Sequence, residues 1–473
     1  MSAIDSKRKE NTNMQSKCNT KIEINKVRVE FTEKKITAYG GFSLLASFFE
    51  RIKLKDIIEE VIPVQERSPN SIGIYSKILS YMLMIYAGGN RFSHLLYLGC
   101  QEVLSELFAT GRLPLAATTL TRLFGKIHTM KEVEAMSEGL WGYLCKLIPC
   151  GKIIEDWLTF DSTVIERYGK QEGVKKGYNP KKKGRGSHSP LLAFLNKSKY
   201  VVNLWNRPGN VASWNNIIGF FESTYQRIGA FIKIKGVIAD SGFYYKKFIE
   251  LLQQNGVIFI IAARLYRPLQ RKVYAQQEWQ QIAEGIWITE FKFKHDEWDH
   301  EYRYIAVRQD IKRRKHAMGK TLSLFANDFD TKDYRFSVWI TNSQDKPHAV
   351  WQMCRPRAND ENTIKELKED FALGGFSMKK FYPTEAAMLV RVFIYNLFVL
   401  FRYEIFGEKE RTEHLKTLRY KYFVMPAQLG RDGKRLILRI SAFTRTIRSK
   451  LLYLYNRIEQ YSPYDKGNCN AVG

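Results

Sequence analysis

The sequence predicts an α/β fold in its central part, with an all-α segment before it and a β-rich segment interrupting it. Three observations predict this class. Apolar residues recur at helical spacing between residues 36 and 150, and short β-prone runs alternate with helical stretches from about residue 157. Three further β-prone runs follow without helices between them. The chain has 473 residues, which is enough for two or three domains.

The N-terminal part divides into two segments. Residues 1–35 are polar and rich in Lys, Asn and Glu, so we expect a loose arm. Residues 36–150 show the apolar spacing of helices, as in the run Leu44–Phe49, and are expected to form a helical DNA-binding domain.

One short stretch of this helical domain, residues 114–124, resembles the turn and second helix of a helix-turn-helix motif. Thr118 or Thr119 would then cap the helix, and Thr121 and Arg122 would face outward. An ordinary helix of a bundle explains the same residues equally well.

Residues 151–263 carry the alternation on which the α/β prediction depends. We expect strands at 157–164, 190–195, 199–205, 236–240 and 257–262, and helices at about 212–228 and 243–254. Three strands followed by helix, strand, helix and strand is the order of an RNase H-like fold. Parallel α/β sheets place their chemistry at the carboxyl ends of strands, where Asp161 and Asp240 fall.

The remaining chain is expected to complete this core. Residues 264–345 read as antiparallel strands and form a β-rich insertion. Residues 346–402 complete the RNase H-like domain with a last catalytic helix, from about Arg355 to Leu373, and a buried helix at 384–402. Residues 403–473 form a basic C-terminal region with an Asp-Gly hairpin turn at Asp432.

The charge balance indicates a polyanionic partner. The chain has 75 Lys and Arg against 48 Asp and Glu, a formal net charge of +27. No uncharged apolar run reaches the ~18 residues that a membrane helix needs, because Arg391 interrupts the longest candidate. The N-terminus lacks an apolar signal region, and the six cysteines form no CxxC pair. We therefore expect a cytoplasmic protein without membrane contact, disulfide framework or zinc site.

Two aspartates, Asp161 and Asp240, each follow a short apolar run and precede a serine. An ionised carboxylate at the end of an apolar strand needs a cation or hydrogen bonds to stay charged. One such residue is explained by capping or a turn. Two of them, with Glu361 as a third, favour a pair of divalent metal ions, and metal pairs serve phosphodiester chemistry.

The third carboxylate lies in a predicted helix whose spacing places Arg357, Glu361 and Lys368 on one face, with Lys365 close by. A solvated helix face with an i,i+4 pair between Glu361 and Lys365 explains this spacing equally well, but leaves the strand-end aspartates unexplained. The helix holds two further acids that fall elsewhere on its surface: Glu366 and Glu369.

A basic segment, residues 175–185, follows the strand that bears Asp161. Its glycines and tyrosine suit a flexible loop that contacts phosphates, although a solubilising surface loop fits the same composition. The expected phosphate contacts are Lys181, Lys182, Lys183 and Arg185.

These residues carry a family resemblance. The chain resembles a bacterial insertion-sequence DDE transposase of the cut-and-paste type, in the group whose third acid lies in a Tyr-x2-Arg-x3-Glu-x6-Lys signature. Arg357, Glu361 and Lys368 match that signature, whereas Cys354 stands at the tyrosine position. Shorter stretches at residues 167–173, 177–185, 190–194, 207–210, 239–243 and 364–371 also resemble one transposase subgroup.

The resemblance implies a bacterial, nucleoid-associated transposase that binds the terminal inverted repeats of its element as a homodimer. It would cleave double-stranded DNA with two Mg²⁺ ions, for which Mn²⁺ can substitute, and join the ends to target DNA. Asp161, Asp240 and Glu361 would hold the metals, and Arg357 and Lys368 would bind phosphates. Two alternatives stay open: an RNase H-like nuclease or resolvase without transposition, and a non-catalytic DNA-binding regulator.

The resemblance also bears on the aromatic residues of the β-rich segment. Related transposases stack a tryptophan on a flipped base, and here the candidates are Trp279, Trp287 and Trp298, each of which is also explained as a core residue. The run His295–His300 has the residue types of a metal cluster, but its place between two predicted strands indicates a polar hairpin turn.

Overall fold

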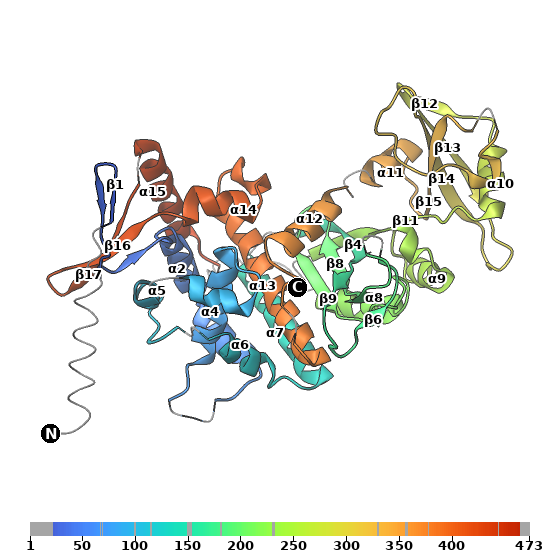
Figure 1. The fold of residues 1–473 in the computed structure, drawn as a ribbon. Helices are drawn as coiled ribbons and strands as arrows, with labels where there is room; N and C mark the ends of the chain where they lie inside the picture. Colours follow the sequence, from blue (N-terminus) through green and yellow to red (C-terminus); the bar gives the residue numbers. More distant parts are fainter. Residues whose placement is uncertain are drawn as a thin grey trace, which may run out of the picture.

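The computed structural model describes residues 22–463, apart from residues 67, 69, 99–100, 114–115, 149–153, 180–181, 229–231, 329–330, 355–357, 377 and 443. Its two main parts are a helical part and a large mixed sheet (Figure 1). The sheet has nine strands in the order β12-β13-β14-β15-β11-β10-β4-β8-β9.

The centre of the sheet contains the alternation expected from the sequence. Its elements in chain order are β4 (Ile154–Ser162), β8 (Leu191–Leu195), β9 (Val201–Trp205), α8 (Ile217–Arg227), β10 (Ile232–Ala239), α9 (Lys246–Gln254) and β11 (Phe259–Ala262). Strands β4, β10 and β11 are parallel neighbours. Strand β8 runs antiparallel to β4, and β9, which is antiparallel to β8, therefore points in the same direction as β4. All five residues of β8 are buried, as its uninterrupted apolar run requires.

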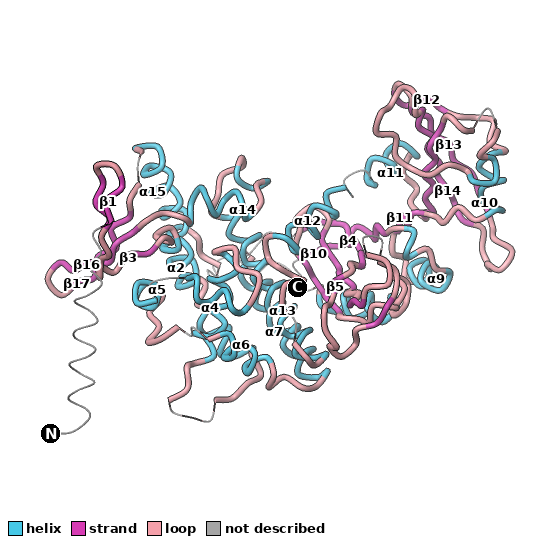
Figure 2. Tube along the Cα trace, in the orientation of Figure 1, coloured by secondary structure: helices cyan, strands magenta, loops and turns pink. Residues whose placement is uncertain are grey.

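The β-rich segment 264–345, expected as an insertion before the last catalytic helix, continues the central sheet. After α10 (Arg267–Tyr274), the strands β12 (Gln280–Ala283), β13 (Ile286–Phe293), β14 (Tyr302–Asp310) and β15 (Tyr334–Thr341) form an antiparallel meander. Strand β15 then pairs with β11, so the meander extends the central sheet (Figure 2).

The helix expected from Arg355 to Leu373 is divided differently. Helix α11 (Pro347–Cys354) comes first, residues 355–357 lie outside the described residues, and α12 (Ala358–Glu369) follows. The helix was expected to reach about Leu373, but α12 ends four residues earlier, at Glu369.

The helical part consists mainly of residues 42–147. Its elements are α2 (Phe42–Arg51), α3 (Leu54–Val61), α4 (Ile74–Tyr86), the 3-10 helix η1 (Phe92–Leu98), α5 (Gln101–Leu107), α6 (Ala117–Phe124) and α7 (Met130–Leu147). Helix α7 begins with a capping box, in which Thr129 and Glu132 satisfy each other's backbone N–H groups. In α6 the outward positions of Thr121 and Arg122 are confirmed, but the cap is Ala116 and not a threonine.

Helix α13 (Phe381–Glu404) joins the helical part to the sheet. It packs against α7 on one side and β9 on the other, and the buried residues of both parts form one continuous cluster. The helical part and the sheet therefore share one hydrophobic core. Arg391 is fully buried here, and its guanidinium donates to the carbonyls of Ala372 and Ala387.

By length and composition α13 could cross a membrane, and it is the one helix among the described residues that could. Its most apolar window is completely buried within the protein.

The C-terminal region packs against the start of the chain. After α14 (Leu415–Leu418), the hairpin β16 (Ala427–Asp432) and β17 (Arg435–Ile440) pairs with β3 (Ile36–Thr37), and α15 (Arg445–Gln460) packs on α2. Residues 22–29, expected to belong to a loose arm, form the hairpin β1 (Ile22–Ile24) and β2 (Val27–Val29). Residues 1–21 lie outside the described residues.

Candidate active site

The two strand-end aspartates lie next to each other. Strands β4 and β10 are parallel, and Phe160 is the register partner of Ala239. Asp161 is the next residue of β4, and Asp240 directly follows the last residue of β10, so the two aspartates lie at the ends of neighbouring strands, which are spaced about 4.8 Å apart. The sheet therefore brings both carboxylates to the same edge, at the carboxyl ends of β4 and β10.

Local hydrogen bonds orient both carboxylates. Asp161 accepts from the backbone N–H of Ser162 at 2.7 Å, and Asp240 accepts from the backbone N–H of Gly242 at 2.7 Å. The second bond caps the 3-10 turn η2 (Ser241–Phe243). A Cβ on Gly242 would lie 2.7 Å from the Asp240 carboxylate, so the turn needs glycine at this position.

A serine that sequence reasoning missed, Ser213, also lies at this edge. Its hydroxyl is 2.7 Å from that of Ser162, and a Cβ on Gly242 would lie 3.0 Å from the Ser213 Cβ. It comes from the loop between β9 and α8, and nothing in its local sequence distinguishes it from an ordinary loop serine. Ser213 thus joins the two strand ends from a third segment.

Helix α12 is anchored beside this edge. Lys368 donates to the carbonyl of Val164, two residues after β4, at 3.1 Å. The backbone of Glu361 belongs to α12, but its side chain, like Arg357 as a whole, lies outside the described residues. Lys365 is exposed on α12. The structure therefore places the helix, and the contribution of Glu361 stays a prediction.

The opposite side of α12 carries an acidic cluster formed by Glu366, Asp370 and His414. Their possible ligand atoms lie within 4.8 Å of one another. Glu366 already forms an ion pair with Arg402 at 3.1 Å, and it accepts from the backbone N–H of Leu415 at 3.1 Å. Asp370 accepts from the backbone N–H of residue 416 at 3.2 Å. These bonds tie α12 to α13 and α14, and a metal would have to compete with a buried guanidinium. A structural role therefore fits this cluster better.

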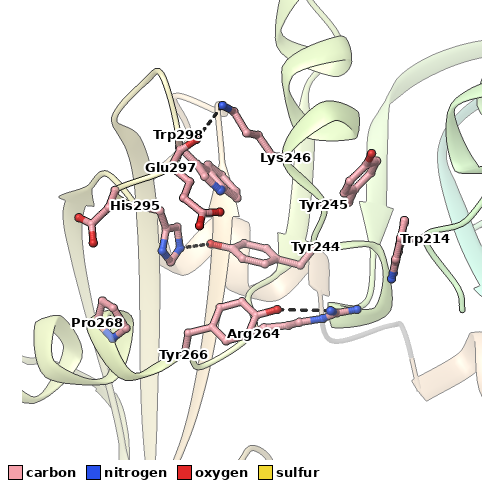
Figure 3. A pocket seen from close by; sticks show the side chains of 11 residues that line it. Trp214, Tyr244, Tyr245, Lys246, Arg264, Tyr266, Pro268, His295, Glu297 and Trp298 are labelled. Carbon is pink, nitrogen blue, oxygen red and sulfur yellow. Dashed lines mark hydrogen bonds between the residues drawn. The ribbon is translucent and has the colours of Figure 1, made fainter.

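A pocket of about 480 Å³ opens beside the turn that holds Asp240 (Figure 3). Arg264 forms its link to the active-site edge, because its guanidinium donates to the carbonyls of Ser241 and Gly242 at 2.7 and 3.3 Å. Aromatic rings form most of the lining: Trp214, Tyr244, Tyr245, Tyr266, His295 and Trp298.

The pocket walls are held by short contacts between α9, the β13–β14 turn and the sheet. The Tyr244 hydroxyl lies 2.6 Å from His295 Nε2 and 2.7 Å from the hydroxyl of Tyr304. The ring of Trp298 lies 5.3 Å from that of Tyr244. Burial lowers the pKa of His295, which favours its neutral form. His295 thus lies in the turn between β13 and β14, as expected, and serves packing rather than a metal cluster.

The two other tryptophans of the β-rich segment have different surroundings. The guanidinium of Arg308 lies 4.5 Å from the ring of Trp279 and 5.4 Å from that of Trp287. Trp279 also donates to the carbonyl of Gln276 at 3.0 Å. Among the three candidates for base stacking, Trp298 is therefore the one that lines the pocket.

Described residues of the basic segment 175–185 contact a small three-stranded sheet. Strand β6 (Lys175–Lys176) pairs with β7 (Gly186–His188), which pairs with β5 (Ile165–Glu166). Lys182 bonds to Glu166 at 3.0 Å, and the guanidinium of Arg185 stacks 4.4 Å from the ring of Tyr168. Lys183 is exposed, and Lys181 lies outside the described residues.

A buried pair connects this small sheet to the segment after α12. Arg167 donates to His188 Nδ1 at 3.1 Å and to the carbonyl of Gly374 at 3.0 Å. His188 Nε2 faces the carbonyl of Glu172 at 2.9 Å, and burial lowers the pKa of His188 to about 4. The imidazole is therefore neutral near pH 7, with its proton on Nε2.

Comparison with known proteins identifies the family of this chain. Residues 19–463 match the family described as transposase DDE domain group 1. The chain belongs to this family and is a DDE transposase. No match to a curated protein was found. The fold comparison includes a piggyBac transposase synaptic complex with hairpin DNA, determined by cryo-EM, at 12% identity and a TM-score of 0.42, covering 92% of this chain and 88% of that one.

Proposed function

We propose that this DDE transposase cleaves DNA at the ends of a bacterial insertion sequence and joins those ends to target DNA. The observation that carries the proposal is the position of Asp161 and Asp240 at the carboxyl ends of two parallel neighbouring strands, directly after the register pair Phe160 and Ala239. The sheet order β9-β8-β4-β10-β11, in which only β8 is antiparallel to the other four strands, supports an RNase H-like core around these residues. Family membership over residues 19–463 supports transposition in general.

The proposed metal ligands are Asp161, Asp240 and Glu361. Position 361 precedes Lys368 by seven residues, so the helix returns it to the side of α12 that Lys368 uses to reach the end of β4. Carboxylate oxygens suit Mg²⁺, with Mn²⁺ as a substitute. Two such ions activate the attacking water or 3′-hydroxyl and stabilise the leaving oxygen. The backbone hydrogen bonds to Asp161 and Asp240 keep both carboxylates oriented before metal or DNA arrives.

The DNA backbone would be held by basic residues around this edge: Arg357, Lys365 and Lys368 near α12, and Lys181, Lys182, Lys183 and Arg185 in the basic segment. The net charge of +27 supports such a partner. We assign Lys368 a second role, because its bond to Val164 fixes the helix that carries Glu361. Cys354, at the family's tyrosine position, is buried at the end of α11.

The aromatic pocket suits a base taken out of the DNA helix close to the cleaved bond. Its volume of about 480 Å³ and its tryptophan and tyrosine rings provide stacking surfaces for a base. Trp298 is the stacking residue in this proposal, and Arg264 connects the pocket to the Asp240 turn. Two protomers would bridge the two ends of the element as a homodimer.

The test is a cleavage and joining assay on linear DNA that carries the element's terminal repeats, with Mg²⁺ or with EDTA. We expect Asp161→Asn, Asp240→Asn and Glu361→Gln each to abolish cleavage and to leave DNA binding largely intact, since affinity comes mainly from phosphate contacts. Glu369→Gln is the matched control, because Glu369 lies on the same helix and no proposed role involves it.

Three outcomes contradict the proposal. Cleavage without joining indicates an RNase H-like nuclease or resolvase. Binding without any cleavage by the unmodified protein indicates a regulator. Full cleavage by Glu361→Gln shows that another acid completes the site.

A further inference from the structure

The hairpin β16–β17 forms a two-stranded ribbon at the end of the molecule far from α12 and β4 (Figure 1). Its strands pair from Ala427 with Ile440 to Asp432 with Arg435, and the turn is Gly433-Lys434. Gly433 has φ of +57°, which the turn requires and glycine adopts without strain. Within the described residues, strand pairing covers the ribbon at its base, where β16 pairs with β3.

The ribbon and the residues after it are strongly basic. Residues 427–450 contain seven Lys and Arg against a single acid, Asp432. Four of the cations lie on the ribbon: Arg431, Lys434, Arg435 and Arg439, all of them exposed. No ion pair in the described part of the chain involves these four. Positive charge therefore gathers here without acids that would neutralise it.

The two faces of the ribbon differ. The register places Gln428, Gly430, Ile437 and Arg439 on one face together with Asp432 and Arg435. Gly430 has no side chain, and the guanidinium of Arg439 lies against it, across the ribbon. This face carries cations near both ends. The other face carries Arg431 together with Leu429, Leu436 and Leu438, and Ile440 at its base packs against the core.

We propose that the β16–β17 ribbon is a second DNA-binding surface, one that binds a groove of duplex DNA away from the cleaved bond. The proposal rests on the proposed function, since it assumes that the protein acts on DNA. The major groove admits a two-stranded β-ribbon, and arginine and lysine side chains along such a ribbon reach the flanking phosphates. Arg445 and Arg448, exposed at the start of α15, extend the same basic surface.

Charge decides between DNA and a second copy of the chain as the occupant. A dimer interface through this ribbon would place two sets of four cations against each other with one acid on each side, which is unfavourable. A polyanion neutralises the same cations. The position of the ribbon, far from the sheet, indicates a contact with DNA beyond the segment held at Asp161.

The test compares two variants of the full-length protein. One changes Arg431, Lys434, Arg435 and Arg439 to Gln, and the other changes the three arginines to Lys and so keeps the charge. Binding to a random-sequence duplex is measured by fluorescence anisotropy between about 50 and 200 mM salt, the range over which phosphate binding dominates affinity. We expect the Gln variant to bind more weakly and its log–log salt slope to fall by about 0.9 for each phosphate that the variant no longer neutralises, up to about 3.6. The Lys variant should keep the slope of the unmodified protein.

Sedimentation and circular dichroism of both variants complete the test. An unchanged slope in the Gln variant, with the hairpin folded, overturns the inference, and so does a change of oligomeric state with DNA affinity preserved. Weaker binding by both variants also overturns it, because that result makes the arginines structural. If the unmodified protein does not bind DNA at all, it is the proposed function that fails, and the two failures are thus distinguishable.

Discussion

The buried ion pair between Glu366 and Arg402 makes a prediction that separates stability from catalysis. Both side chains are 6% exposed, and they meet at 3.1 Å. In Glu366→Ala, Arg402 keeps its bond to the carbonyl of Glu413 but has no counter-charge. Removing one partner of a buried pair costs about 3–5 kcal/mol. We therefore expect Glu366→Ala to lower the free energy of unfolding by about that amount.

The assay is denaturant unfolding followed by tryptophan fluorescence, with DNA cleavage measured per folded molecule at low temperature. The double variant Glu366→Leu/Arg402→Met should be more stable than either single change, because no unpaired charge stays buried. Glu369→Ala, on the same helix and outside the pair, should cost less than about 0.5 kcal/mol. Folded Glu366→Ala should still cleave DNA.

Two results refute this reasoning. A loss of stability below about 1 kcal/mol in Glu366→Ala means that the pair does not hold α12 to α13 in the way its burial indicates. Stabilisation of the unmodified protein by Mg²⁺ that disappears in Glu366→Ala means that Glu366, Asp370 and His414 form a metal site.

Three further predictions concern other parts of the molecule. Burial raises the pKa of Glu385 to about 7, from 4.5, so between these pH values the folded state binds a proton that the unfolded state releases. The free energy of unfolding should therefore fall by on the order of 3 kcal/mol as pH rises from about 4.5 to 7. In denaturation curves measured across this range, Glu385→Gln should flatten that fall. Changing Lys182, Lys183 and Arg185 to Gln should make DNA affinity less dependent on salt. The slope of log affinity against log salt concentration should fall in magnitude by about 0.9 for each phosphate that is no longer bound. An unchanged slope would show that the segment is a solubilising surface. Trp298→Ala should slow DNA cleavage far more than it weakens DNA binding in a gel-shift assay, because the lost ring would no longer stack on a base. Trp298→Phe should keep most of the cleavage activity. Equal reductions in the cleavage rate of the two variants speak against stacking.

The strand-end aspartates were predictable because the signal is local. An apolar run that ends in Asp-Ser shows both the strand and its carboxyl end, and the parallel pairing of β4 with β10 follows from the connection through β8, β9 and α8. The continuity of the sheet was not predictable, because the paired residues of β11 and β15 are about 80 positions apart and no local pattern specifies that pairing. The burial of Arg391 was not predictable for the same reason. In the sequence it only interrupts an apolar run, whereas in the folded protein its guanidinium donates to the carbonyl of Ala372, in the segment before α13.

The candidate site was predictable in part. Glu366 and Lys368 lie two residues apart and so face opposite sides of α12, which helical spacing anticipates. Spacing could not anticipate that Lys368 bonds to Val164 or that Lys182 pairs with Glu166, since both interactions depend on segments that meet only in the folded protein. The predicted cap of α6 was wrong for a simpler reason: Thr118 and Thr119 have the side chains that favour capping, but the observed cap, Ala116, comes two or three residues earlier.

The central position of α13 has a consequence for how the chain folds during synthesis. Helix α7 ends at Leu147 and packs on α13, which begins at Phe381. At translation rates of about 5–20 residues per second, the helices made first wait roughly ten seconds to a minute for the segment that covers them. During that interval their apolar faces stay open on the nascent chain. The newly made transposase therefore passes through a stage in which chaperone binding competes with self-association, and it becomes a complete folding unit only when nearly all of it has left the ribosome.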